Sequence, residues 1–319
     1  MKTGAKVGLI IAAVLVVVGL IGAGLIVALG GWRLPNVKNA EFGTRTVLVE
    51  DDFDTISIES DTEDIVFGLS EDGSCQVVFR EYDFHQHTAE VKGNTLEIRG
   101  KDTRRWYERA FSFSFEDTAI TLLLPERVYD LMIDEDTGKV TIPEVTQFGN
   151  VDVKTSTGDV EFGASAANVK IRCSTGDIHV AYSAVNSLDL EVSTGHVKVS
   201  SVKCAGDFRL KVSTGKSELK DVRCGSFTSG GSTGDIEMEG LLVSGALNIE
   251  RSTGDVQFDG CDALELEVKT DTGKVTGTLL TEKVFIVKSD TGKIDVPEST
   301  NGSKCKITTD TGRISISIK

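Results

Sequence analysis

The sequence is poor in several residue types, and each shortage excludes a class of function. Only four of its 319 residues are histidine, and its six cysteines show no Cys-x-x-Cys spacing, so it lacks the common zinc-binding motifs. Its 34 lysines and arginines are outnumbered by 49 acidic residues, and the net charge of −15 argues against nucleic acid as a partner. Apart from only four prolines and as many as 33 glycines, the composition is ordinary. It indicates an acidic body of the soluble type, together with whatever the N-terminus adds.

One long apolar run lies near the N-terminus, where residues 7–29 are uncharged and almost wholly apolar. A run of this length crosses a bilayer as a helix. We expect residues 1–6, with Lys2 and Lys6, to form a cytoplasmic tail and the acidic remainder to lie outside the cytoplasm. The alternative is a cleaved signal peptide ending near Ala28-Leu29-Gly30. The run is longer than an ordinary signal core, which favours a retained anchor.

A Thr-Gly dipeptide recurs ten times in the second half of the chain, at gaps of 18 to 20 residues. Its glycines are Gly138, Gly158, Gly176, Gly195, Gly215, Gly234, Gly254, Gly273, Gly292 and Gly312. Ten copies at a nearly constant period indicate a repeat architecture. Glycine in such a turn supplies a positive φ, so we expect these ten residues to be structural turn glycines.

Apolar residues flank each turn at alternate positions. Seven residues before the glycine stand Leu131, Val151, Val169, Leu188, Phe208, Phe227, Leu247, Leu266, Phe285 and Cys305. The position five before the glycine is apolar except at Ser229, and the position two after it is apolar except at Ser217. This alternation predicts two short half-buried strands in each copy rather than a helix.

Two arrangements bury these columns of apolar residues. In a β-solenoid the copies stack as coils, and each column becomes a ladder of like side chains about 4.8 Å apart. In an up-and-down antiparallel sheet, each Thr-Gly is a two-residue hairpin loop. We favour the solenoid, because a flat sheet leaves one broad face uncovered and because a third apolar column follows the turn. That column is Val145, Val202, Val222, Leu241, Cys261 and Leu280.

The sequence therefore predicts an all-β protein, a β-solenoid of 19–20-residue coils with an irregular N-terminal cap and one transmembrane helix. We expect a tether over residues 30–44, the cap over 45–130 and the solenoid over 131–319. Within the cap, Ile56 and Ile65 have the spacing of a degenerate coil in which Glu63 replaces the glycine. The chain ends on an apolar alternating stretch from Ile314 to Lys319, which predicts an exposed edge at the C-terminal end of the stack.

Two groups of residues have the side chains of a metal site. His85 and His87 lie on one face of an extended segment and can bind a metal with Glu81 or Asp83, although a polar loop is the commoner explanation. Aspartates follow four of the turn glycines and could together bind calcium. Lysine or arginine occupies the same position in other repeats, which favours a solvent-exposed edge of mixed charge over a calcium site. Those aspartates are Asp159, Asp177, Asp235 and Asp255. We expect no metal, no cofactor and no catalytic residues.

The cysteines Cys204 and Cys224 each lie nine residues after a turn glycine, so a solenoid stacks them on neighbouring coils. The pair is either a disulfide or two small apolar fillers.

One basic, aromatic stretch stands out in this acidic chain. It contains Arg104, Arg105, Trp106, Tyr107 and Arg109. Arginine and aromatic residues are favoured at interaction sites, so this stretch is a candidate loop for binding anionic lipid or cell-wall polymer. The alternative is a loop whose aromatic rings pack on the cap.

The repeated Ser/Asp-Thr-Gly-Asp/Lys-Val/Ile turns, the strand Ile120–Pro125 and the single anchor helix resemble the bacterial putative-adhesin family of β-strand-repeat proteins of unknown function. The resemblance covers about Val47 to the C-terminus, and Glu63 departs from its glycine pattern. It implies a solenoid-like domain at the cell envelope, in some members associated with envelope-stress regulation. It brings no catalytic residues.

We therefore expect a membrane-anchored, extracytoplasmic protein that acts as a non-catalytic binding or scaffold surface at the bacterial envelope. Its expected partners are the membrane, an envelope polymer or a membrane protein. One alternative is a regulatory partner of a membrane envelope-stress sensor. Another is a polysaccharide-active β-helix enzyme, which the mixed charges of the outward columns disfavour. Gly230-Gly231-Ser232-Thr233-Gly234 matches a hydrolase pattern only because it is one more copy of the turn.

Overall fold

The computed structural model describes residues 41–102, 117–144 and 146–319, and the described chain folds as β-strands and turns without a helix. Accordingly, these residues contain no helix long and apolar enough to cross a membrane. The predicted anchor over 7–29 lies outside the described residues, as does most of the predicted tether.

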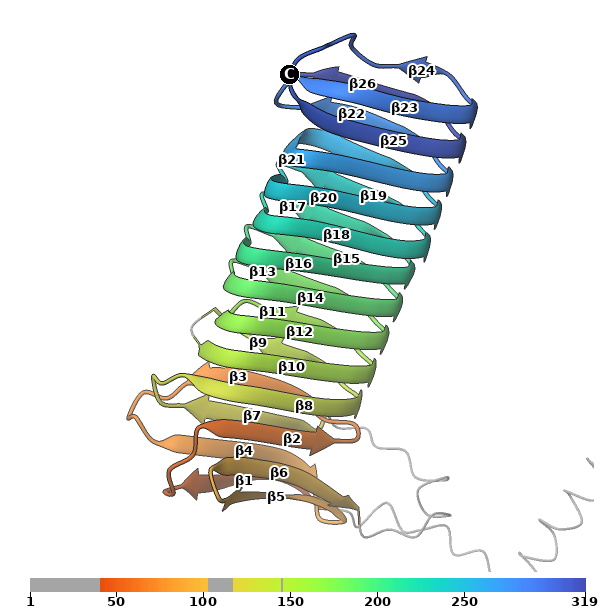
Figure 1. The fold of residues 1–319 in the computed structure, drawn as a ribbon. Helices are drawn as coiled ribbons and strands as arrows, with labels where there is room; N and C mark the ends of the chain where they lie inside the picture. The colour runs from red at the N-terminus through yellow and green to blue at the C-terminus, as the bar shows by residue number, and fades with distance from the viewer. Residues whose placement is uncertain (1–40, 103–116, 145) are drawn as a thin grey trace, which may run out of the picture. The chain divides into compact units, whose positions relative to one another are not determined.

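Two series of parallel strands build the solenoid (Figure 1). The strands before each turn are β2 (Thr55–Ser60), β8 (Tyr129–Thr137), β10 (Gln147–Thr157), β12 (Ser165–Thr175), β14 (Ala184–Thr194), β16 (Lys203–Thr214), β18 (Arg223–Thr233), β20 (Leu242–Thr253), the second half of β21 (Val256–Thr272), β23 (Lys283–Thr291) and β25 (Ser303–Thr311). The shorter strands after each turn are β3 (Asp64–Leu69), β9 (Val140–Ile142), β11 (Val160–Phe162), β13 (Ile178–Ala181), β15 (Val197–Ser200), β17 (Ser217–Lys220), β19 (Ile236–Glu239), the first half of β21, β22 (Val275–Leu279), β24 (Ile294–Asp295) and β26 (Ile314–Ile318).

The register of these strands confirms the solenoid over the antiparallel hairpin ladder. Strand β14 pairs in parallel with β16, and β16 with β18, so that Leu188, Phe208 and Phe227 stand in one column. All three side chains are buried, at no more than 1% exposure. The predicted apolar columns thus form the core, while the charged residues between them lie on the outer faces.

The turn glycines form a ladder of their own along one corner of the stack. The N–H of every turn glycine except Gly292 donates to the carbonyl of a threonine on the neighbouring coil, for example Gly195 to Thr214 at 3.0 Å. Gly195 has φ +146°, and a Cβ there would lie only 1.9 Å from the carbonyl oxygen of Gly176. Glycine is therefore required by the close approach of the coils as well as by backbone conformation.

The C-terminal end differs from the expectation. Strands β25 and β26 insert between the β21–β22 coil and the β23–β24 coil, so β23 and β24 are outermost among the described strands (Figure 1). Ile314 and Ile316 are consequently buried, and the predicted exposed edge over Ile314–Lys319 is wrong. The reason is that each repeat has the same apolar pattern, which fixes register within a coil but not the order of stacking. The edge instead exposes Ile286 and Ile294.

The N-terminal end carries further strands beyond the first coil. These are β1 (Phe42–Val49), β4 (Cys75–Tyr82), β5 (His85–Lys92), β6 (Thr95–Asp102) and β7 (Ala119–Leu124). Strands β6 and β7 continue the parallel stack below β2 and β3, whereas β1, β4 and β5 add to it in antiparallel orientation. Ile56 pairs with Leu131 and Ile65 with Val140, so the coil containing Glu63 has the register of the later repeats.

Candidate functional site

A groove runs across successive coils on the side of the stack where the long strands begin, and it encloses about 910 Å³. Its floor is a column of small or apolar side chains that are in register and at most 5% exposed. They are Val185, Cys204, Cys224, Val243 and Ala263. Next to the floor, the long strands contain irregularities in pairing, such as the shift between Cys204 and Asp207 opposite β18. These bulges bend the strands and hollow this side of the solenoid.

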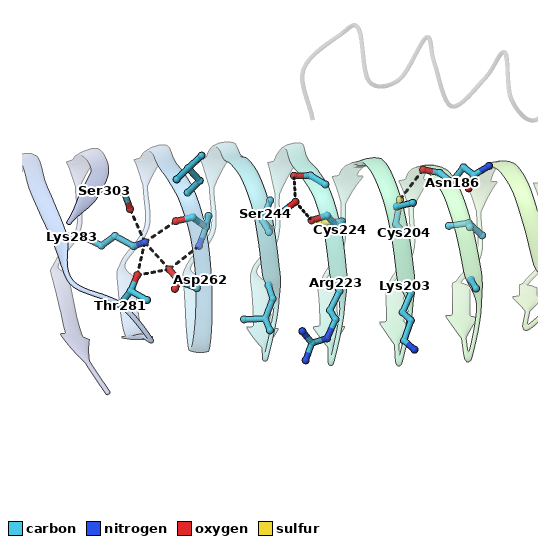
Figure 2. A pocket seen from close by; sticks show the side chains of 18 residues that line it. Asn186, Lys203, Cys204, Arg223, Cys224, Ser244, Asp262, Thr281, Lys283 and Ser303 are labelled. Carbon is cyan, nitrogen blue, oxygen red and sulfur yellow. Dashed lines mark hydrogen bonds and ion pairs between the residues drawn. The ribbon is translucent and has the colours of Figure 1, made fainter.

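Two cations stand at the edge of this groove. Lys203 and Arg223 pair in register on β16 and β18 and extend side by side from neighbouring coils (Figure 2). Both are exposed, and neither forms an ion pair within the described part of the chain. By contrast, nearby Lys220 contacts the carboxylate of Glu239 at 2.9 Å. The groove therefore has two uncompensated positive charges beside an apolar floor, in a chain of net charge −15.

The C-terminal end of the groove is closed by Lys283 of β23, which is 1% exposed. Its ammonium group donates to the Asp262 carboxylate at 2.6 Å, to the carbonyl of Ala263 at 2.7 Å and to the Ser303 hydroxyl at 2.9 Å (Figure 2). The charge is fully compensated, so Lys283 is a structural residue here. It ties the outermost coil to β21 across the inserted strand β25.

A second group of polar residues is buried at the N-terminal end. His85 and His87 are 8% and 2% exposed, and Glu63 is 1% exposed between them. Burial tends to raise the pKa of Glu63, but the neighbouring His87 ring and hydrogen bonds from the Ser60 hydroxyl and the N–H of Thr62 lower it to about 2. Burial tends to lower the pKa of His87, but the carboxylates of Glu63 and Glu81 raise it above its ordinary value.

Of the metal ligands considered from sequence, Glu81 is buried with these histidines, whereas Asp83 is exposed. Glu63 comes from a different coil and was not predicted to join them. The sequence did contain one indication of this role, because Glu63 occupies the position at which the later repeats have glycine.

The other sequence candidates fare differently. Arg104, Arg105, Trp106, Tyr107 and Arg109 lie outside the described residues. The aspartates considered for calcium accept backbone N–H groups from the next coil, as Asp235 does from Asp255 at 2.7 Å. Cys204 and Cys224 stack in register as expected, and both are free thiols. The sequence analysis missed Lys203 and Arg223, although both lie eight residues after a turn glycine.

Several solved structures are similar to this chain at low identity. A putative adhesin from Parabacteroides merdae shares 12% identity, with 88% of this chain and 97% of that chain covered at a TM-score of 0.45. A putative adhesin from Parabacteroides distasonis shares 14% identity, with 87% of this chain and 98% of that chain covered at a TM-score of 0.47. A putative lipid binding protein from the same species shares 15% identity, with 88% of this chain and 98% of that chain covered at a TM-score of 0.46. Likenesses of this degree carry no functional argument.

No curated protein matches the chain. A family model does, and it is described as Toastrack DUF4097. It matches residues 53–220, a little over half of the sequence, from the coil that contains Glu63 to the end of β17. The chain therefore belongs to the Toastrack DUF4097 family.

Proposed function

We propose that this protein is a non-catalytic binding surface at the bacterial cell envelope, held there by the apolar segment over residues 7–29, and that the groove binds an extended anionic envelope polymer. The observation that carries the proposal is the pair of unpaired cations, Lys203 and Arg223, beside an apolar floor. Fixed cations next to an apolar surface favour a ligand with negative charge on a chain-like body.

The shape of the groove supports an extended ligand rather than a compact one. The groove crosses five successive coils, from Val185 on β14 to Ala263 on β21, and stacked strands are about 4.8 Å apart. A ligand that follows it therefore meets the same kinds of side chain at regular intervals of about 4.8 Å. Such a surface binds by many weak contacts and supplies specificity through the two charges.

The location is tested with a C-terminal tag on the full chain in intact bacterial cells. We expect external protease to remove the tag, because the acidic body is proposed to lie outside the membrane. Protection until lysis would contradict the envelope location but would leave the groove to be tested separately.

The groove is tested by binding of the purified full chain, in detergent, to anionic polymer isolated from the cell envelope. Lys203→Glu/Arg223→Glu is expected to weaken binding at least tenfold. The matched control is Lys198→Glu/Lys304→Glu, which makes the same charge change at exposed positions outside the groove. Equal losses in both variants would show a general charge effect and overturn the groove as the site.

A second candidate function is a contact with a membrane protein, through the edge formed by β23 and β24. Among the described strands these two pair on one side alone, with β25 and β26, and they expose Ile286 and Ile294. An unpaired strand edge with exposed apolar side chains is suited to pairing with another protein's strand. Cross-linking from Ile286 to a membrane sensor or transporter, but not from Met132 on β8, would favour this alternative.

A further inference from the structure

The turn-glycine ladder ends at Glu63, in the first coil. The Glu63 carbonyl oxygen lies 2.4 Å from where a Cβ on Gly138 would be, so Glu63 stacks directly on that glycine. A glutamate at this corner is unusual, because the later coils place glycine there. Its side chain is buried and turned toward strand β5, where it meets the two histidines.

The donor atoms of these three side chains converge. Glu63 Oε1 lies 3.3 Å from His85 Nδ1, and Glu63 Oε2 lies 3.5 Å from His87 Nε2. One ligand atom from each of the three residues falls within 4.8 Å of the others, and no other described residues form such a group. Ligand atoms in a tetrahedral zinc site with bonds of about 2.0–2.1 Å are about 3.3 Å apart. Each histidine therefore lies at about this distance from the Glu63 oxygen that it faces, and the two distances run to different oxygens of the same carboxylate.

The surroundings of His87 orient its ring for this role. Its Nδ1 lies 2.9 Å from Glu81 Oε2, and its backbone N–H donates to the same oxygen at 2.7 Å. Arg45 holds the other Glu81 oxygen at 2.8 Å. Donation from Nδ1–H to a fixed carboxylate leaves the lone pair of Nε2 directed toward Glu63, as in the carboxylate–histidine–zinc arrangement.

One nitrogen of each imidazole ring lacks a hydrogen bond. The Nε2 atoms of His85 and His87 are buried and have no hydrogen-bond partner among the described residues. Buried polar atoms without a partner are rare in native proteins and call for an explanation.

The two imidazole rings fit here because Gly100 has no side chain. Gly100 pairs with His87 across the β5–β6 hairpin, and a Cβ there would lie 2.9 Å from the Nε2 atoms of both His85 and His87. Gly100 is exposed, so the cluster is separated from solvent on this side by a residue without a side chain.

From this geometry we propose that Glu63, His85 and His87 bind one divalent transition-metal ion, best matched by Zn²⁺, with water at the fourth position. Two imidazoles and a carboxylate are a donor set that zinc accepts, and sites with three protein ligands take water at the fourth position. The ion ties the first coil to the β5–β6 hairpin, and Glu81 is a positioning residue for His87. The proposal replaces our expectation from the sequence that no metal is bound.

The test uses Zn²⁺ with the metal-stripped full chain in detergent. We expect one equivalent per chain by titration calorimetry and by elemental analysis after dialysis. Co²⁺ is expected to give the intense visible absorption of a tetrahedral site without a thiolate band. Glu63→Gln and His85→Gln are each expected to weaken binding at least 100-fold, and Glu81→Gln by 10-fold to 100-fold.

His196→Gln is the matched control, because this histidine is exposed and pairs with Asp177 far along the repeat. It is expected to bind Zn²⁺ as the unchanged chain does. Because a buried substitution can disturb folding, Gly100→Ala is a second variant that keeps all three ligands and is expected to weaken binding by crowding the rings. The proposal is overturned by the absence of saturable binding, by a thiolate band, or by binding that survives Glu63→Gln. Those results would leave His87 as an imidazolium held between Glu63 and Glu81.

Discussion

The glycine ladder makes Gly195→Ala the most informative single change in the repeat. The added methyl carbon would lie 1.9 Å from the Gly176 carbonyl oxygen, whereas real contacts of this kind stay beyond 3.0 Å. The two coils must therefore separate locally by about 1 Å or more, which disturbs the corner hydrogen bonds on either side. In addition, φ of +146° at Gly195 is unfavourable for alanine. Backbone strain of 1–3 kcal/mol and one weakened hydrogen bond of about 1 kcal/mol give a loss of roughly 3 kcal/mol.

The assay is urea unfolding of the full chain in detergent, followed by circular dichroism of the β-sheet signal. The control is Gly230→Ala, because the space around a Cβ at Gly230 is open to 4 Å and its φ is not left-handed. We expect the control to change the free energy of unfolding by less than about 0.5 kcal/mol. If Gly195→Ala were as mild as the control, the steric account of the ladder would be refuted.

Two further predictions concern buried groups in the core. Ser229, the one polar exception in its column, accepts a hydrogen bond of 2.8 Å from the buried Arg251 guanidinium, and burial lowers the pKa of Arg251 to about 10. Ser229→Ala is expected to cost about 2 kcal/mol of unfolding free energy, but little in an Arg251→Met background; equal costs in both backgrounds would contradict this pairing. Burial also raises the pKa of the cysteine thiols, and that of Cys224 to about 12. We therefore expect iodoacetamide at pH 8 to modify none of the six cysteines in the folded chain and all of them after unfolding. Rapid labelling of the folded chain, as counted by mass spectrometry, would show that the thiols are accessible.

The sequence predicted the coil itself well, because period-two alternation on both sides of a glycine turn has few ways to bury its apolar side. Leu188, Phe208 and Phe227 stack as that pattern requires. Residues that depart from this pattern also indicate where the structure departs from a regular coil. Ser229 contacts Arg251, and Glu63 leaves the glycine pattern where it meets the buried histidines.

Features that depend on contacts between distant repeats could not be predicted. The convergence of Glu63 with His85 and His87 brings together the turn between β2 and β3 and the distant strand β5, which no local spacing encodes. Lys203 and Arg223 form a pair only once the coils are stacked in register. The stacking order at the C-terminal end is hidden for a related reason, since β23 and β25 present similar apolar columns to β21.

The inserted position of β25 and β26 has a consequence for the time course of folding. A solenoid can grow by adding each new coil to the edge of the previous one, so most of this chain can fold in the order in which it is synthesised. The β23–β24 segment is an exception, because its neighbours β25 and β26 are synthesised after it. Its final place is reached only when β25 and β26 lie beside β21 and β22. Residues 303–319 therefore complete this end of the described stack, and a chain cut before them loses the pairing partners of β23 and β24.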